Sequence, residues 1–290
     1  MKSIGAIWPS WIVARMTFRE AIRRRIVLTG LVLGILFLIL FSIGAYLIST
    51  EIERETLAEG GAAYQNIMQT EMSNFLLMAG LYAVTFLSVA MGALLGADTL
   101  AGEINSGSIQ TILTKPIRRS DVVFGKWLGF AGLLGLYAIL MSGGVILIVF
   151  LQSDYIPRNM LTGLSLIYLE SLLVMTISLA GSSAMPALAT GGMVFGLYGL
   201  AFLGGWIEQI GTLANIPAAV QIGIVSSLVV PTEALWRRAA YEMQTPLASA
   251  LGMSPFGAFS APSVLMVLYA ILYLVIVFAI AVSTFNRRDI

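Results

Sequence analysis

The 290-residue sequence contains no cysteine and no histidine. The lack of cysteine excludes disulfides, thiolate metal sites and cysteine nucleophiles, and the lack of histidine excludes imidazole ligands and the commonest general base. We therefore expect no catalytic residue and no metal site in this chain. The 14 methionines are scattered through apolar segments, where methionine normally serves as packing material, so they do not change this expectation.

Charge is also scarce, because 11% of the residues are charged whereas 58% are hydrophobic. A water-facing surface needs far more charge than this, so the composition indicates a polytopic membrane protein. The net charge of +1 gives no support to nucleic-acid binding. A phosphate-binding loop of the type GxxxxGKS or GxxxxGKT is absent, and the nearest fragment, FGKW at 124–127, lacks the leading glycine and the hydroxyl. We expect no ATP hydrolysis by this chain.

Long apolar runs predict an all-α fold with six transmembrane helices, in one domain that covers residues 1–290. The expected spans are 26–49, 75–97, 122–151, 161–181, 187–206 and 263–285. Before the first span, an apolar face predicts an amphipathic helix over about 8–25 that lies in the membrane interface; a frayed tail is the alternative. This face consists of Trp8, Trp11, Ile12, Phe18 and Ile22, with Thr17, Glu20 and Arg24 on the opposite side.

Basic residues predict the orientation, because lysine and arginine near span ends stay in the cytoplasm. Six spans place most of the 16 basic residues inside, put both termini in the cytoplasm of a plasma or inner membrane, and leave the acidic segment 50–74 as an external loop. The basic residues left outside are Arg54, Arg158, Arg237 and Arg238.

Residues 207–262 are expected to form an external region of re-entrant or surface helices, followed by the amphipathic piece PTEALWRRAAYEM. The run 210–230 is apolar but is broken at Asn215-Ile216-Pro217, and such breaks are tolerated where protein buries them. A seventh span at 210–230 is the alternative. The distribution of basic residues does not separate the two, and six spans are preferred because the broken run is the weakest candidate.

The segment from Asp98 to Lys126 is expected to be the main cytoplasmic loop. Gly107 can stop the preceding helix, Ser108 can cap a new short helix, and Pro116 prevents that helix from continuing. The aliphatic side chains of this short helix share one face, on which a cytoplasmic partner could push; an ordinary connector lying on the lipid surface is the alternative. They are Ile109, Ile112 and Leu113. Ser120 is expected to cap the third span, with Asp121 in its first turn.

Four segments carry a resemblance to a known family: TFREAIRRR, GEINSGSIQTILTKPIRRSDVVFGKWLG, VVPTEALWRRA and FNRRDI. Together they resemble the permease subunit of type-2 ABC transporters, most of all the stand-alone NosY-type permeases of bacteria and archaea. The resemblance implies an elbow helix at Trp8–Arg25 and a coupling helix at Ser108–Pro116. It implies a role in coupling-loop geometry and ATPase docking for Glu103, Gly107, Thr114, Pro116 and Arg119.

The resemblance further implies a permease homodimer that carries two separate ABC ATPase subunits and works as an ATP-driven exporter. ATP and magnesium would be used by the partner subunits, and no cofactor would be bound by this chain. The substrate does not follow from the sequence.

Two features inside the spans are further candidates. Glu170 lies in the middle of the fourth span, where an ionisable residue is costly enough to need a partner or water, so it is a possible translocation-path or polar site; a structural hydrogen bond is the alternative. Gly192, Gly196 and Gly199 in the fifth span could form a dimer seam or line the path, or could simply pack inside the bundle. Glu170 also supports a second function, that of an ion- or proton-coupled secondary transporter. A membrane assembly subunit without transport is a third alternative, because no residue in the sequence names a substrate.

Overall fold

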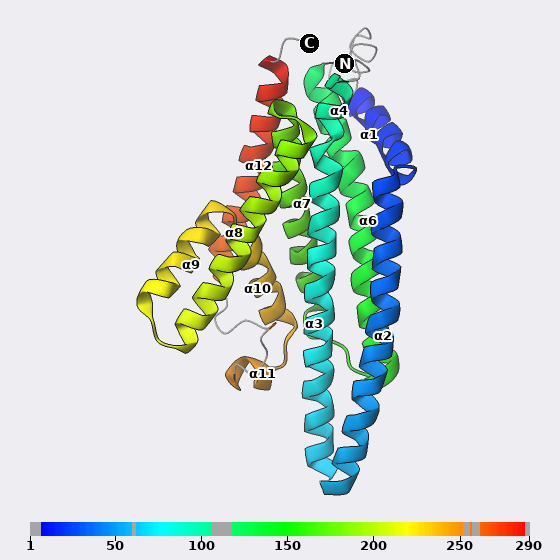
Figure 1. Ribbon diagram of the computed structural model, residues 1–290, viewed down its shortest axis with the longest axis vertical. Helices are drawn as coiled ribbons and strands as arrows, with labels where there is room; N and C mark the ends of the chain where they lie inside the picture. Colours follow the sequence, from blue (N-terminus) through cyan, green and yellow to red (C-terminus); the bar gives the residue numbers. More distant parts are fainter. Residues whose placement is uncertain (1–6, 60–61, 106–117, 252–255, 257–261, 288–290) are drawn as a thin grey trace.

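The computed structural model describes residues 7–59, 62–105, 118–251, 256 and 262–287, and every regular element in these ranges is a helix (Figure 1). The helices are α1 (Ile7–Ile22), α2 (Arg25–Glu59), α3 (Ala62–Ala97), α4 (Thr99–Asn105), α6 (Arg119–Ser153), α7 (Met160–Ala184), α8 (Ala187–Leu213), α9 (Pro217–Val229), α10 (Thr232–Met243), α11 (Pro246–Leu251) and α12 (Val264–Arg287).

Six of these helices, α2, α3, α6, α7, α8 and α12, are long and apolar enough to cross a membrane. The prediction of an all-α polytopic membrane protein with six spans is therefore confirmed. Because an even number of spans returns the chain to its starting side, α1 and the last turn of α12 lie at the same end of the molecule (Figure 1).

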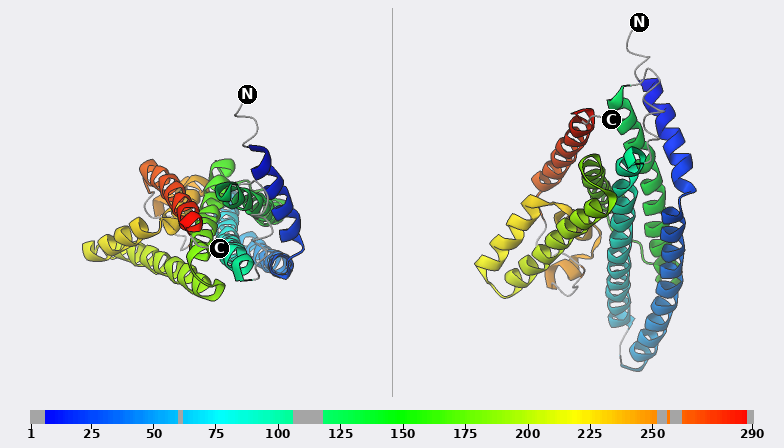
Figure 2. Two further views of the ribbon diagram at one scale, coloured as in Figure 1. Left: turned by 90° about the horizontal axis from the view of Figure 1, so that it is seen from above. Right: turned by 45° about the horizontal axis from the view of Figure 1, so that its top comes forward.

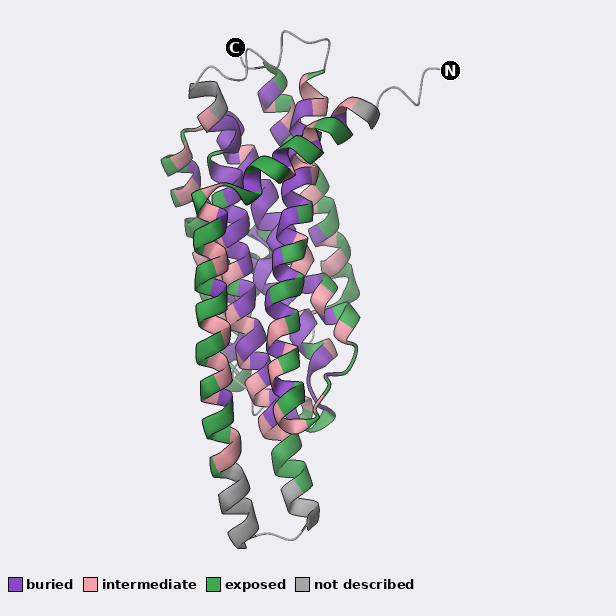
Figure 3. Cartoon of the chain, turned by 90° about the vertical axis from the view of Figure 1, so that its right-hand side faces the viewer, coloured by how far each residue is buried: buried purple, intermediate pink, exposed green. Residues whose placement is uncertain are grey.

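The helices α2 and α3 continue well past the expected spans and form a long hairpin. The segment 50–74, expected as a loop, is helical over 50–59 and over 62–74. The reason is composition: glutamate, alanine, leucine, glutamine and methionine dominate this segment, and all are strong helix formers. Each helix is about 50 Å long at 1.5 Å per residue. The hairpin therefore extends beyond the rest of the bundle (Figure 3).

The helix α1 packs along α6 through small side chains. Ser10, Ala14 and Thr17 are buried, and a Cβ added at Gly125 or Gly129 of α6 would lie 2.6 Å from a main-chain oxygen of α1. Thr17 was expected on the polar side, away from the membrane; the glycines instead draw this side onto α6. Trp11, Ile12 and Ile22 of the apolar face are exposed, as an interfacial helix requires, whereas Phe18 packs against the core.

The centre of the bundle is built by α3, α6, α7 and α10. Met78, Leu134 and Leu173, one from each of the first three, are fully buried. Two glycines of α3 bring its backbone close to α7, because a Cβ at Gly92 would lie 2.9 Å from the Ser171 carbonyl oxygen, and Gly96 approaches α7 in the same way. By contrast, few residues of α2 and α12 are buried, and both helices lie at the outside of the bundle, so they form lipid-facing sides (Figure 1).

The third span begins one residue before the expected cap. Arg118 is the N-cap of α6 and makes no side-chain capping bond, so Ser120 lies inside the first turn and does not cap the helix. Asp121 lies in this first turn as expected, where its charge favours the positive end of the helix dipole. The second span is interrupted at Asp98, earlier than the expected stop at Gly107.

The region after α8 doubles back on itself. Asn215 turns the chain with a φ of 55°, which asparagine tolerates better than most residues, and α9 then returns along α8. The pair α9 and α10 is bent by 106° at Val230-Pro231, where proline cannot continue the hydrogen-bond ladder. The run 210–230 is thus shared between the end of α8 and α9. It is not a straight seventh span in this structure (Figures 1 and 2).

The helix α10 is the largest departure from expectation. The segment was expected to be an external amphipathic piece, yet most of its side chains are buried against α7, α8 and α12. Trp236 is 1% exposed and Arg237 is 3% exposed, although Arg237 had been placed outside with Arg238. A pattern of alternating charges and apolar residues fits a water-facing helix and a helix with a buried ion pair equally well.

Candidate functional site

The expected coupling contact can be located only in part. Its central residues lie outside the described residues: Gly107, Ser108, Ile109, Ile112, Leu113, Thr114 and Pro116. Glu103 is in the last turns of α4, and its side chain is likewise outside the described set. Arg119 begins α6, and its guanidinium donates a hydrogen bond to the carbonyl oxygen of Asn286 at 3.4 Å. Arg119 therefore joins the start of the third span to the end of the sixth.

The helices that flank this loop are fastened together by a small apolar cluster. It contains one side chain from each of four helices: Leu100 of α4, Val123 of α6, Leu179 of α7 and Phe285 of α12. Each is at most 1% exposed. A displacement of the loop at α4 or α6 would therefore be passed directly to α7 and α12, because close-packed side chains transmit strain.

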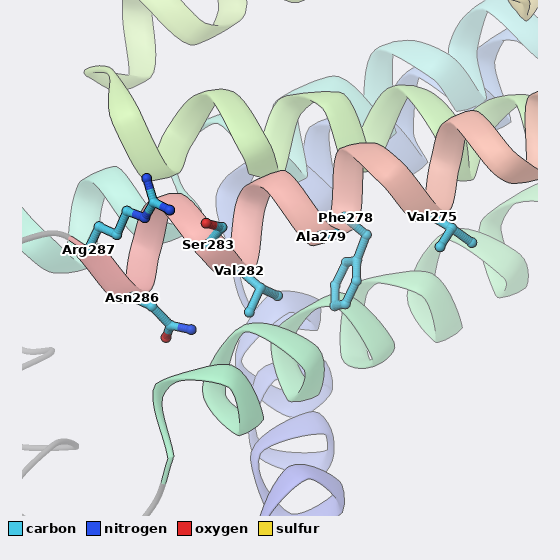
Figure 4. A pocket seen from close by; sticks show the side chains of 7 residues that line it. All are labelled: Val275, Phe278, Ala279, Val282, Ser283, Asn286 and Arg287. Atoms are coloured by element: carbon cyan, nitrogen blue, oxygen red, sulfur yellow. The ribbon is translucent and has the colours of Figure 1, made fainter.

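A pocket of about 490 Å³ lies along one face of α12 beside this cluster (Figure 4). Val275, Phe278 and Val282 make its lining apolar, and Asn286 and Arg287 add polar groups at the end of the helix. The chain thus presents an apolar groove with a polar, basic end near the membrane surface.

Glu170 is the most unusual side chain inside the bundle. It lies on α7, it is 1% exposed, and neither of its carboxylate oxygens has a hydrogen-bond partner among the described residues. Glu170 is therefore buried inside the bundle, as expected. The alternative was a structural hydrogen bond, but the Glu170 carboxyl group has no hydrogen-bond partner in the described part of the chain. An unsatisfied buried carboxyl group is costly, so it calls for a functional reason.

The packing of α7 and α10 places a second carboxyl group near Glu170. These helices run in opposite directions, and Met243 at the end of α10 lies against Gly163. Seven residues back along α10 and seven forward along α7, about 10 Å in each case, Trp236 comes opposite Glu170. Glu233, one turn before Trp236, is 3% exposed and interacts electrostatically with Glu170.

Aromatic rings from α3 and α8 complete this site. The Tyr82 ring lies 5.0 Å from the Trp236 ring between centroids, and the indole nitrogen of Trp206 donates to the Tyr82 hydroxyl at 3.2 Å. Tyr198 of α8 is also buried, and its ring lies 6.2 Å from the Phe86 ring of α3 between centroids. Four helices, α3, α7, α8 and α10, therefore meet at one polar site inside an apolar bundle. We call Tyr82, Glu170, Tyr198, Glu233 and Trp236 the carboxylate site.

A buried ion pair lies beside the carboxylate site. The two terminal nitrogens of Arg237 donate to the two carboxylate oxygens of Glu208 at 2.5 and 2.9 Å, a bidentate arrangement that links α10 to α8. Arg237 also lies 3.4 Å from the Ser227 hydroxyl of α9. Since Gly223 allows α9 to approach the Glu208 side chain closely, the pair is enclosed by three helices.

The charges of this region do not balance. Glu170, Glu208 and Glu233 are buried, and Arg237, bound to Glu208, is the one buried arginine that the described residues bring to them.

Of these four residues, Glu170 was found from the sequence, because it interrupts an apolar run. Glu208 was missed, because it lies just beyond the expected end of the fifth span. Glu233 and Arg237 were also missed, although their four-residue spacing is the signal of a helix that carries both charges on one face.

A separate polar network closes the opposite end of the bundle. The Thr245 hydroxyl donates to Glu71 at 2.8 Å, and the Tyr155 hydroxyl donates to the Asn74 side-chain oxygen at 3.2 Å. Burial, with a smaller effect of Glu71, raises the pKa of Tyr155 to about 12, so its phenol stays a proton donor at neutral pH. This network ties α3 to the α6–α7 connection and to the start of α11.

The glycines in the first half of α8 face away from the bundle, whereas Gly204 and Gly205 lie against Ser226 and Glu233. A Cβ added at Gly192, Gly196 or Gly199 would meet no atom within 4 Å, in contrast to the glycines of α3 and α6. The alternative that Gly192, Gly196 and Gly199 pack inside the bundle is therefore wrong for the described residues. The helix projects from the bundle together with α9, and its outward stripe includes Leu188 and Leu203 (Figure 2).

Among the described residues, no three acidic side chains are close enough to hold a metal ion. In comparisons with known proteins, a family model described as ABC-2 family transporter protein matches residues 11–290. The match covers all six spans, α10 and Arg119. No curated protein matches the chain.

Proposed function

This chain belongs to the ABC-2 transporter family and is a membrane permease component of an ABC transporter, and we propose that it is the translocating subunit of an ATP-driven exporter. The observation that carries the proposal is the match of the family over nearly the whole chain, together with a sequence that lacks a phosphate-binding loop. The motor is therefore a separate ABC ATPase, which binds ATP and magnesium. Both chain termini face this ATPase in the cytoplasm, and the NosY-type permeases are the expected subgroup.

Coupling runs from the loop between α4 and α6 into the membrane. The loop carries Ile109, Ile112 and Leu113, and both of its ends connect to the apolar cluster of Leu100 and Phe285. Arg119 adds a polar link to α12. A push from the ATPase on the loop would therefore move α7, which carries Glu170.

The functional unit is a homodimer with two ATPase subunits. The outward glycine stripe of α8 supports this arrangement, because glycines at four-residue spacing let two membrane helices approach closely and no other described residue packs on this stripe. The carboxylate site lies on the inner side of the same helix, so the translocation path would run beside the seam.

The test co-expresses the chain with the ABC ATPase encoded nearest to it and purifies the complex in lipid nanodiscs. A stoichiometric complex is expected, with two copies of each chain. Replacing Ile109, Ile112 and Leu113 together by alanine should weaken ATPase binding by about tenfold or more, since a few apolar anchors dominate such contacts. The control removes three aliphatic side chains from the lipid-facing side of α12, at Leu265, Leu268 and Leu272, each more than half exposed.

Unchanged ATPase binding in the loop variant, with the control also unchanged, would contradict the coupling role. Uphill transport that needs a proton gradient, continues without ATP and disappears in Glu170→Gln would replace the proposal with a secondary transporter. A chain that binds no ATPase and moves no solute would be a membrane assembly subunit.

A further inference from the structure

We propose that the carboxylate site receives the positively charged nitrogen group of an organic substrate, with Glu170 and Glu233 as its counter-charges. This inference rests on the proposed function, because it assigns a substrate class to the translocation path. Two independent observations support it: the unpartnered carboxyl group of Glu170, and the group of aromatic rings that α3, α8 and α10 bring to this part of the bundle.

The first observation concerns charge. Glu170 is 1% exposed with both oxygens unpartnered among the described residues, and Glu233 is close enough to interact with it. The buried guanidinium of Arg237, one helical turn from Glu233 on α10, is bound through both terminal nitrogens to Glu208, so one positive charge faces three buried carboxyl groups. Two carboxyl groups in a dry interior need either bound protons or an external cation. One or two additional positive charges would therefore neutralise the buried carboxyl groups of the site.

The second observation concerns the walls of the site. Tyr82, Tyr198 and Trp236 come from three different helices; the Tyr82 and Trp236 rings lie 5.0 Å apart between centroids, and the register set by the Met243–Gly163 contact places Trp236 opposite Glu170. Aromatic faces attract cations, tryptophan most strongly, and rings combined with a carboxylate are a recurrent way to bind ammonium groups. Phe86 and Phe202 extend this aromatic wall, with ring centroids 6.2 Å from Tyr198 and 6.4 Å from Tyr82.

The geometry favours an organic cation over a metal ion. Metal ions of biological importance take several oxygen ligands at short distance, and no group of three acidic side chains in the described residues meets that need. An alkylammonium group, in contrast, is satisfied by one or two carboxylates and by ring faces. The substrate class is therefore a hydrophobic amine or quaternary ammonium compound.

The substrate must reach the site in another conformation, because Glu170 and Glu233 are both almost fully buried here. The contact between α7 and α10 is the wall that would open. The helix α10 follows the 106° bend and is tied to α8 by the Arg237–Glu208 pair, whereas its hydrogen bond to the α7 side, from Asn159 to Glu242, lies at the far end of the helix. An ATPase-driven displacement of α7 would therefore separate Glu170 from Glu233 and change the affinity for a bound cation. Such a change of affinity between states is what export requires.

The experiment measures binding to the purified full-length chain in nanodiscs, without ATP. The probes are benzyltrimethylammonium and its neutral carbon isostere neopentylbenzene, and binding is followed by tryptophan fluorescence. The cation is expected to bind at least about 30-fold more tightly than the isostere, since a buried charge pair contributes a few kcal/mol. Glu170→Gln should remove most of this preference, while Glu170→Asp, which keeps the charge, should retain part of it.

The matched control is Glu51→Gln, the same chemical change at an exposed position near the far end of α2, which should leave both affinities unchanged. Equal affinity for the cation and the isostere would overturn the proposal. So would a Glu170→Gln variant that is more stable than the wild type yet binds the cation normally, since this would mean that Glu170 merely holds a proton. Because the assay needs no ATPase, these results are separate from failure of the proposed coupling, which would appear only in ATPase binding.

Discussion

The bundle of α1, α3, α6 and α7 and the projecting pair of α8 and α9 use the same kind of residue in opposite ways. Glycines at four-residue spacing occur in both, at Gly92 and Gly96 of α3 and at Gly192 and Gly196 of α8. In the bundle they are covered by a neighbouring helix, whereas on α8 they face open space. A spacing pattern therefore predicts close approach of a partner, but it does not say whether the partner belongs to the same chain.

The buried polar groups also differ between the two regions. In the bundle, the Trp127 indole donates to the Thr176 hydroxyl at 2.9 Å, while the hydroxyls of Ser88 and Ser142 have no partner among the described residues. Between α8 and α10, the buried groups are the Arg237–Glu208 ion pair and the Glu233 carboxyl group. The contact of α8 with α10 therefore depends on charge, whereas the bundle is held mainly by close packing. The predictions below test this division.

The largest effect is expected at the buried ion pair. Arg237→Ala should destabilise the protein by about 3–5 kcal/mol, because it leaves the Glu208 carboxylate buried and unpaired. Thermal and denaturant unfolding in detergent would measure this. Arg238→Ala, at the partly exposed neighbour that pairs with Glu242, is the control and should cost much less. A double variant, Glu208→Gln with Arg237→Met, should recover most of the loss; equal costs at both arginines would remove the contrast between the two regions.

The next effect belongs to the bundle. Gly96→Ala should cost about 1–3 kcal/mol, because the new Cβ would lie 2.6 Å from the Cβ of Ser178 and 2.8 Å from the Met175 carbonyl oxygen on α7. Gly143→Ala is the matched control, since a Cβ there meets nothing within 4 Å and alanine favours a helix. The same unfolding experiment measures both. A neutral Gly96→Ala would mean that α3 and α7 are not held as closely as described.

A smaller effect separates two buried threonines. Thr176→Val in the bundle should cost about 1 kcal/mol, because the Trp127 indole loses its acceptor. Thr190→Val on α8 should be neutral or stabilising, since the Thr190 hydroxyl is buried without a hydrogen-bond partner among the described residues. Paired unfolding curves would show the difference. The reverse order would indicate that the α8 region, not the bundle, depends on its hydroxyls.

The smallest effect on the single chain is expected on α8. Gly192→Ala with Gly196→Ala should change subunit stability by less than about 0.5 kcal/mol, because the added methyl groups meet no atom of the same chain. The same change should weaken the homodimer, which single-molecule photobleaching in nanodiscs would count directly. A dimer that is unaffected would place the seam elsewhere.

The six spans could be predicted because their signal is local: each is a run of apolar residues, and hydropathy reads such runs directly. Glu170 could be predicted for the same reason, as the one carboxylate in the middle of such a run. The position of α10 could not, because PTEALWRRAAYEM has the same composition whether its charges meet water or each other. Whether Arg237 is buried depends on its partner Glu208, which lies 29 residues away in the sequence. The packing of α1 on α6 was likewise hidden, since it depends on small residues in two distant segments.

The bent segment also constrains how the protein is made. A helix that carries Glu233 and Arg237 is a poor candidate for direct insertion, because each arginine near the centre of a membrane helix costs about 2.5–3.5 kcal/mol in the insertion machinery. Arg237 becomes acceptable in the interior only once Glu208 is there to receive it. We therefore expect α10 to enter after the first five spans have assembled, as a late step of biogenesis that the sixth span then closes.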